Sequence, residues 1–373
     1  MNPAAQDSSA SDVSLVALAG RTPRYRPFLF TKRAERDALN DLDAATLAGV
    51  TPVFVVTPRD LDFDTGNYKK PFDAHLAAIA ELINQVNTVD TLYLDVSLVE
   101  HEGPLANGMS AMEAVLNDLA PSQRTVIPLV DADSSTQTLA AAAAAANNGV
   151  AVRLTSAHWP SGVPHVLSAI LATLGVSDID VDLILDCGDE LGHLAVLAAT
   201  SEVAAIASGR TFRSVTFAGA AWPKNMPAGA ANHEIPRDDF AAYVNLATAC
   251  ASRATAVPDY ADWAVAHPDP SLDVDPRILN IAATMRYTCV DKWVLGKGGL
   301  YKGNGGKSKG GAVVRPMLVA LTAHSEYRSV LSCEAERWID DVVAGRTGPG
   351  NPGIWRRWAL VRHLTLTVKQ LST

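Results

Sequence analysis

Eight short apolar runs divide the first 260 residues of this chain, and stretches with helical periodicity separate them. Near-continuous apolar strands are typical of a parallel sheet that is covered on both faces. Eight such strands alternating with helices predict an α/β fold, a (β/α)₈ barrel of the TIM type. The predicted strands are residues 27–30, 52–56, 91–94, 126–130, 150–152, 182–185, 214–217 and, more weakly, 256–257.

A doubly wound open sheet would also alternate strands and helices. When such a fold binds a dinucleotide, it carries a glycine-rich turn after its first strand. Residues 30–35, Phe-Thr-Lys-Arg-Ala-Glu, contain no glycine, and the strand count reaches eight, so the sequence favours the barrel. The predicted helices are residues 33–42, 72–86, 109–119, 135–147, 164–174, 191–207 and 238–253.

The composition limits the classes of partner and the compartment. The chain has 373 residues, 48% of them hydrophobic, which suffices for one large α/β domain or a barrel with a tail. Its net charge of −9 gives no overall attraction to nucleic acid or to an anionic membrane, although it is compatible with a local basic patch. The four cysteines form no Cys-x-x-Cys pair, which predicts reduced thiols in a cytoplasmic protein and argues against a zinc–thiolate site.

The sequence predicts three regions. Residues 1–23 lack the basic start and long apolar core of a signal peptide, and we interpret them as a disordered leader. Residues 24–265 contain the predicted barrel. Residues 266–373 form an appended C-terminal subdomain in this interpretation, with a glycine- and lysine-rich loop at residues 296–311. No stretch approaches the length of about 20 apolar residues that a membrane helix needs.

The residues that follow the strands mark the mouth of the barrel, where folds of this type place their sites. Carboxylates that converge there can bind a divalent cation such as Mg²⁺ or Mn²⁺, or shift one another's pKa values for acid–base chemistry. Alternatively, an aspartate at a strand end caps the next helix, an interpretation that we favour for Asp133, Asp189 and Asp262. The core candidates for a site are Lys32, Asp95, Asp131, Arg153, Asp186 and Asp259.

Each core candidate has an expected role. Lys32 and Arg153 would bind the anionic part of a ligand. The four aspartates would supply acid–base groups or metal ligands, with Asp95 and Asp186 as the metal ligands. His158 follows the fifth strand on the same side of the barrel and would serve as a general base or a substrate contact.

The glycine- and lysine-rich loop contains a partial phosphate-loop pattern. Residues 303–308, Gly-Asn-Gly-Gly-Lys-Ser, match the end of that motif, but Tyr301 stands where its first glycine is required. Exposed amides and Lys307 could still receive a phosphate or a nucleic-acid backbone. A mobile lid or an ordinary surface loop would have the same composition. Residues 355–358, Trp-Arg-Arg-Trp, could stack on bases or anchor the tail to the barrel.

Short motifs follow one another in a fixed order along most of the chain. They are Tyr25-Arg26-Pro27-Phe28-Leu29-Phe30-Thr31-Lys32 with Glu35 and Ala38-Leu39, Trp222-Pro223-Lys224, Ile235-Pro236-Arg237 with Tyr243, Pro258-Asp259-Tyr260, Ala266-His267-Pro268, Met285-Arg286-Tyr287-Thr288 with Trp293, and Trp355 with Arg362-His363. This ordered set resembles the "beta protein" family of phages and bacteria. The resemblance implies a barrel-like fold and a phage or bacterial setting, and it brings no established reaction. The chain departs from the family at Pro258, where a glycine is usual, and at Arg362, where a second histidine often stands beside His363.

Two hypotheses about function follow from these patterns. In the first, the protein is a metal-assisted hydrolase or lyase that acts on a phosphorylated, nucleotide-like or otherwise anionic ligand at the barrel mouth. In the second, it is a non-catalytic protein of phage–host conflict and antiviral defence, whose basic loop and C-terminal tail hold a protein or nucleic acid. The chain lacks Gly-x-Ser-x-Gly and His-Glu-x-x-His motifs, which argues against serine hydrolases and zinc proteases.

Overall fold

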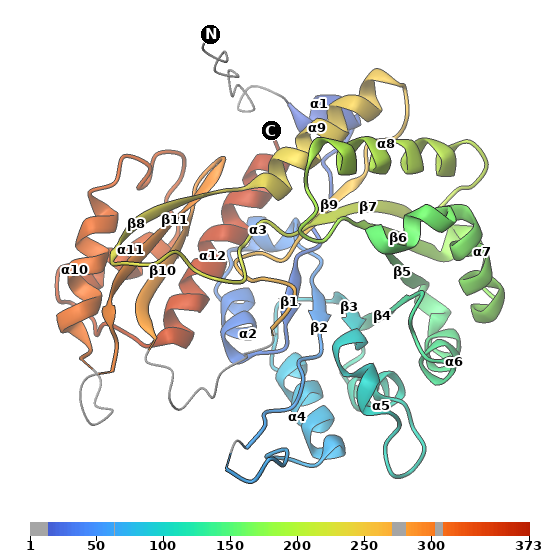
Figure 1. Ribbon diagram of the computed structural model, residues 1–373, viewed down its shortest axis with the longest axis horizontal. Helices are drawn as coiled ribbons and strands as arrows, with labels where there is room; N and C mark the ends of the chain where they lie inside the picture. Colours follow the sequence, from blue (N-terminus) through green and yellow to red (C-terminus); the bar gives the residue numbers. More distant parts are fainter. Residues whose placement is uncertain (1–13, 63, 271–280, 303–308) are drawn as a thin grey trace.

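A parallel barrel forms the centre of the molecule in a computed structural model that describes residues 14–62, 64–270, 281–302 and 309–373 (Figure 1). The strands pair in parallel in the order β1-β2-β3-β4-β5-β6-β7-β9, and a bridge between Tyr25 and Tyr260 joins the two ends of the sheet. The predicted (β/α)₈ fold is therefore confirmed. The barrel strands are β1 (Phe28–Phe30), β2 (Val53–Val55), β3 (Thr91–Asp95), β4 (Thr125–Asp131), β5 (Val150–Thr155), β6 (Val181–Asp186), β7 (Ser214–Gly219) and β9 (Asp259–Asp262).

Helices surround the barrel. Side-chain caps begin several of them, as Ser110 and Ser135 do by accepting a hydrogen bond from the amide three residues further along. Their positions agree with the predicted helical segments except for α3, which was not predicted and buries Thr46. The helices are α2 (Arg33–Asn40), α3 (Ala44–Ala48), α4 (Phe72–Asn84), α5 (Ala111–Leu119), α6 (Thr136–Ala144), α7 (Val163–Leu174), α8 (His193–Ala207) and α9 (Asp238–Ser252). Short 3₁₀ turns are η1 (Ser97–Glu102), η2 (Ala120–Ser122), η3 (Ala146–Asn148), η4 (Ser156–Ser161) and η5 (Asp178–Asp180).

The eighth barrel strand differs from its predicted position. We expected it at residues 256–257, whereas β9 begins at Asp259. The sequence Asp-Tyr-Ala-Asp does not resemble a buried strand, because it begins and ends with a carboxylate. Both carboxylates are nevertheless buried, and both accept hydrogen bonds inside the fold. As a result Asp259 opens the strand instead of following it.

A second, three-stranded antiparallel sheet lies beside the barrel. Its strands pair in the order β10 (Ala282–Thr288), β11 (Lys292–Leu300) and β8 (Ala231–Pro236), and α10 (Gly311–Thr322) and α11 (Glu334–Val343) accompany it (Figure 1). Two expectations need correction here. Residues 231–236 lie within the predicted barrel region but form a strand of the second sheet, and the predicted loop at 296–311 begins inside β11.

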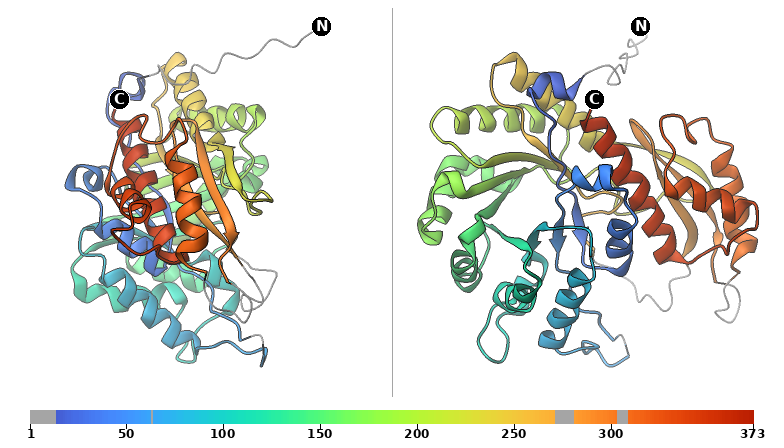
Figure 2. Two further views of the ribbon diagram at one scale, coloured as in Figure 1. Left: turned by 90° about the vertical axis from the view of Figure 1, so that its left-hand side faces the viewer. Right: turned by 180° about the vertical axis from the view of Figure 1, so that it is seen from behind.

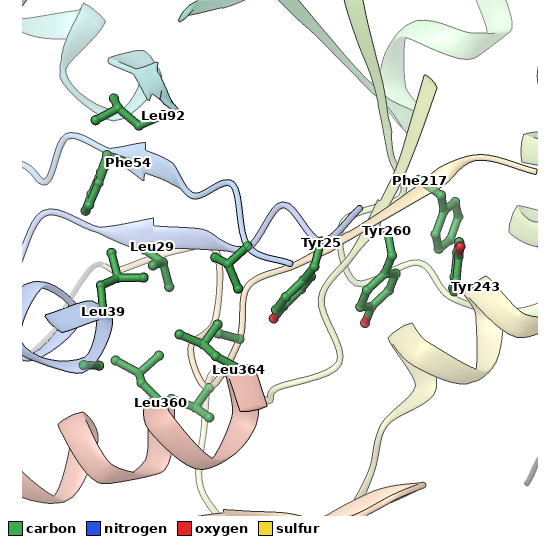
Figure 3. Close-up of a cluster of buried hydrophobic side chains, with 14 of the residues drawn as sticks. Tyr25, Leu29, Leu39, Phe54, Leu92, Phe217, Tyr243, Tyr260, Leu360 and Leu364 are labelled. Carbon is green, nitrogen blue, oxygen red and sulfur yellow. The ribbon is translucent and has the colours of Figure 1, made fainter. Parts of the chain in front are cut away.

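The C-terminal helix α12 (Pro352–Leu371) takes the place of the eighth barrel helix. It packs against α2 on one side and β10 on the other, as the right-hand view of Figure 2 shows. Its Leu360 and Leu364 point toward Leu29 of β1 and Leu39 of α2 (Figure 3). The predicted C-terminal subdomain is present, and it consists of two pieces, one before α9 and one before α12. Because the chain returns to the barrel in α12, we call it the inserted subdomain.

Charged side chains of α12 reinforce this packing. Arg356 donates to Glu35 at 2.8 Å, and Arg357 forms an ion pair with Asp41. Trp355 is buried. The arginines thus anchor the tail to the barrel. The tryptophans, for which we expected that role, pack instead on the inserted subdomain, Trp355 on Tyr301 and Trp358 on Trp338.

The N-terminal segment is also partly structured. Residues 14–23 were expected to belong to a disordered leader, but they contain α1 (Leu15–Ala19), which packs on α9 and buries Leu15. Residues 1–13 lie outside the described part of the chain. None of the described helices is long and apolar enough to span a membrane.

Candidate functional site

The barrel interior is polar at both ends and apolar between them. Inward-facing residues such as Phe28, Val53, Ile127 and Ile184 form the apolar layers. A buried arginine lies beneath them, and another lies above them at the mouth. The two arginines organise the carboxylates of the interior into two separate groups.

Arg26 closes the floor of the barrel. Its Nη1 donates to Asp259 Oδ2 at 2.5 Å and to Thr216 Oγ1 at 2.8 Å, and its Nε donates to the hydroxyl of Tyr93 at 3.1 Å. Asp259 was expected at the mouth, and this expectation is wrong because Asp259 begins β9 and pairs with an arginine that precedes β1. We assign it a structural role in the floor.

Arg153 organises the mouth. Its Nη1 donates to Asp95 Oδ2 at 2.9 Å, its Nη2 donates to Ser97 Oγ at 3.1 Å, and the same nitrogen lies 3.6 Å from Asp131 Oδ2. Asp95, Asp131, Arg153 and Asp186, which lie near one another at this end, are all buried. Three of the four predicted aspartates therefore gather around one of the two predicted cations.

Each of the three aspartates also shapes the chain that follows it. Oδ1 of Asp95 accepts from the amide of Ser97, and Oδ1 of Asp186 accepts from the amide of Gly188, both at 2.8 Å. Asp131 accepts in the same way from the amide of Asp133 at 3.1 Å. Oδ1 of each carboxylate thus stabilises the backbone turn at the strand end. Oδ2 takes no part in that turn and is available for contacts at the mouth.

Asp186 is distinguished by its second oxygen. Among the described residues Oδ2 of Asp186 has neither a hydrogen bond nor an ion pair, whereas Asp95 Oδ2 accepts from Arg153 and Asp131 Oδ2 lies 3.6 Å from Nη2 of the same arginine. Burial raises the pKa of Asp186, and the charge of Asp95 adds to this effect, against the opposing influence of Arg153 and the Gly188 amide. A carboxyl with a raised pKa and an uncommitted oxygen can exchange a proton with a ligand.

The arrangement gives no support to the predicted metal site. Within the described ranges, no three His, Cys, Asp or Glu side chains are arranged so that they could hold a metal ion. The guanidinium of Arg153 lies among the carboxylates and hydrogen-bonds Asp95, which was expected to ligate the metal together with Asp186. The binding of Mg²⁺ or Mn²⁺ by these two residues stays a prediction.

Lys32 belongs to a different part of the rim. The surrounding protein lowers the pKa of Lys32, first by desolvation and then through the charge of Arg356, with a smaller contribution from Arg286. Its ammonium lies 5.4 Å from the centre of the Phe30 ring. The structure thus places Lys32 with cations of the inserted subdomain and α12, instead of with the group around Arg153.

His158 contacts the turn on which it lies. Its Nδ1 accepts from the amide of Thr155 at 3.1 Å, and its Nε2 is 3.4 Å from Asp133 Oδ2. These contacts cap η4, and no contact joins His158 to Asp186 in the described structure. Lys307, which was predicted to bind a ligand, lies outside the described residues.

A cavity of about 800 Å³ opens at the mouth side between α8 and α9. It is lined by side chains that follow β6, β7 and β9, among them His193, Trp222 and His267. Trp222 and His267 belong to the motifs of the family resemblance, but nothing in their local pattern predicted that they would line one cavity. The missing signal was the path of the loops, which places segments far apart in sequence on one rim.

A buried polar cluster connects the outer face of β9 with α12. His363 Nε2 lies 3.0 Å from Asp262 Oδ2, and Tyr25 donates to Asp262 Oδ1 at 2.6 Å. Burial opposes ionisation of Asp262, but the hydrogen bonds from His363 and Tyr25 outweigh it and lower the pKa of Asp262. Burial and the nearby charge of Asp262 raise the pKa of Asp239 to about 7. This cluster lies outside the barrel interior and holds two layers of the fold together.

Comparison with known proteins gives one informative result. No curated protein matches the chain. The model of the Beta protein family, in contrast, matches residues 25–369. The match extends over the barrel and both pieces of the inserted subdomain, and the chain therefore belongs to the Beta protein family.

Proposed function

We propose that the barrel mouth binds a small anionic ligand and that Asp186 exchanges a proton with it, in a hydrolase or lyase reaction. The observation that carries this proposal is the uncommitted Oδ2 of Asp186, a buried carboxyl with a raised pKa at the mouth of the barrel. Proton transfer by such a positioned group contributes about 10²–10⁴-fold to many enzymatic rates.

The neighbours of Asp186 support this role. The single positive charge of Arg153 is shared by the two negative charges of Asp95 and Asp131. The negative charge that is left over favours the protonated form of Asp186. Lys32 stands on the β1 side of the same rim, where it would attract the anionic group of the ligand. One end of the ligand would then lie near Lys32 and the other near Asp186.

The test measures protons released or taken up on binding. Calorimetry in two buffers with different ionisation enthalpies would use AMP and inorganic pyrophosphate as probes. We expect wild-type protein to bind a phosphate-bearing probe with proton exchange, and Asp186→Asn to remove that exchange. Asp180→Asn, which changes an exposed carboxyl just before the same strand, is the matched control and should behave as wild type.

The result that would overturn the proposal is equal proton exchange in wild type and Asp186→Asn, or no binding of either probe by the wild type. Repeating the titrations with added Mg²⁺ or Mn²⁺ and with EDTA tests the predicted metal dependence. A cytoplasmic location and a role in conflict between phages and bacteria stay predictions from the sequence.

The alternative of a non-catalytic scaffold has less support. In that hypothesis the tryptophans of the tail hold a partner, but Trp355 is buried and Trp358 already stacks on Trp338. The first residues of its basic loop, up to Leu300, are part of β11. We therefore place the binding function at the mouth.

A further inference from the structure

A second cavity, of about 790 Å³, lies beside the barrel between the antiparallel sheet and the start of α12. Its wall contains three cationic side chains, Arg286 of β10, Lys297 of β11 and Arg356 of α12. The volume falls in the range of about 300–1,000 Å³ that is typical of small-molecule sites. The other lining residues used below are Ile281, Leu300 and Trp355.

The positive charge in this cavity is incompletely compensated. Arg356 is paired with Glu35, at 2.5 Å between Nη2 and Oε1. Arg286 donates to the backbone carbonyl of Val265, and Lys297 donates to that of Pro227. Among the described residues, no carboxylate lies within ion-pair distance of Arg286 or Lys297. A half-buried cation without a counter-ion gains free energy when an anion binds beside it.

The surroundings of Arg286 raise the free energy of its charged form. Desolvation, together with the neighbouring charge of Arg356, lowers the pKa of Arg286 to about 9. Its guanidinium also lies 4.7 Å from the centre of the Trp222 ring. Because an arginine keeps its proton near neutral pH, an oxyanion bound there would relieve the repulsion between the two guanidinium groups.

The same cavity exposes apolar surface. Ile281 and Leu300 are 41% and 50% exposed, and both line the cavity. Large exposed apolar side chains that meet at a charged cavity are typical of a ligand site. The amides at the start of α12 are occupied by the Asn351 cap, so an anion there would be held by side chains.

We propose that this cavity is a second ligand site, which binds an organic oxyanion with an apolar or aromatic body. Arg286 and Arg356 take the oxyanion, and Ile281 and Leu300 contact the body. The site is separate from the group around Arg153, and it does not depend on the function proposed for the mouth.

The test uses 1-naphthyl phosphate as the probe, with 1-naphthol and inorganic phosphate as its two halves. Calorimetry should show saturable binding of the whole probe to full-length protein and at least tenfold weaker binding of each half. Arg286→Gln should weaken binding of the probe by at least tenfold, and Arg286→Lys by less. Arg357→Gln is the matched control, since this adjacent α12 arginine pairs with Asp41 and does not line the cavity.

A further variant leaves Arg286 and Arg356 unchanged. Leu300→Asp alters an exposed side chain at the end of β11, and it should also weaken binding by at least tenfold, because it removes apolar contact and adds repulsion. The proposal is overturned if wild type shows no saturable binding, or if Arg286→Gln and Leu300→Asp both bind as well as Arg357→Gln. Loss of binding in Asp186→Asn alone would place the probe at the mouth and would equally overturn the proposal.

Discussion

At the scale of single residues, the strand-end aspartates cap turns, as one interpretation of the sequence proposed, and their role in a site stays a prediction. Oδ1 of Asp95 turns the backbone through the amide of Ser97, while Oδ2 of Asp95 accepts from Arg153. A carboxylate has two oxygens, so capping a turn does not exclude a role at the mouth. The second oxygens differ in their partners: in the described structure Asp95 Oδ2 accepts a hydrogen bond and Asp131 Oδ2 forms an ion pair with Arg153, whereas Asp186 Oδ2 has neither.

Arg153 should be costly to remove. We expect Arg153→Ala to lower the free energy of unfolding by about 3–5 kcal/mol, because it leaves Asp95 buried without its cationic partner. Urea denaturation measures this loss. The double variant Arg153→Met with Asp95→Leu should recover part of it, since no buried charge is then left from that pair. A loss below about 1 kcal/mol for the single variant would show that the ion pair does not organise the mouth.

Asp239 should make stability depend on pH. Its folded-state pKa of about 7 lies above the ordinary value of 3.8, so the folded protein binds the proton more tightly than the unfolded chain. This stabilising contribution is complete below pH 4 and is lost as the pH rises toward 7. We expect Asp239→Asn to gain about 1–4 kcal/mol relative to wild type between pH 4 and 7. A constant difference between the two unfolding free energies across this window would contradict the assignment.

At the scale of elements, α12 completes the barrel wall. Leu364 is fully buried against the barrel, whereas Leu194 of α8 is 80% exposed. We therefore expect Leu364→Ala to cost about 2–5 kcal/mol of unfolding free energy and Leu194→Ala less than about 0.5 kcal/mol. Chemical denaturation of both variants measures the contrast. Equal costs would mean that α12 lies loosely on the barrel.

Elements that bury apolar side chains on both faces were the easiest to predict. The first seven barrel strands are apolar runs because helices cover the sheet. The eighth strand was predicted before its true position, because Asp259 and Asp262 do not resemble residues of a buried strand. They are buried in β9 since each has a partner distant in the sequence, Arg26 for Asp259 and His363 for Asp262. β8 was missed since much of Ala231–Pro236 is polar and exposed. A local pattern contains no information about such distant partners.

At the scale of the whole molecule, the inserted subdomain and the barrel should unfold together. The chain crosses between them four times, before and after β8, after β9 and before α12. Far-UV circular dichroism and tryptophan fluorescence should therefore give coincident urea transitions. Two separated transitions would show that the antiparallel sheet is an independent folding unit.

The same topology limited what the sequence predicted about the site. The position of the mouth could be predicted from the strand ends, and Asp95, Asp131, Arg153 and Asp186 lie there near one another. The separation of Lys32 from Arg153, and its proximity to Arg286 and Arg356, depends on how the insertion docks on the rim. That docking is a property of the tertiary structure, and the spacing of residues along the chain does not predict it.

The place of α12 has a consequence for biosynthesis. Helix α12 supplies the wall segment that covers Leu29 and Leu39 (Figure 3). A nascent chain therefore exposes this apolar strip until α12 has left the ribosome, even when all eight strands have already emerged. At translation rates of about 5–20 residues per second the open wall persists for seconds, and it then presents the kind of apolar surface that chaperones bind.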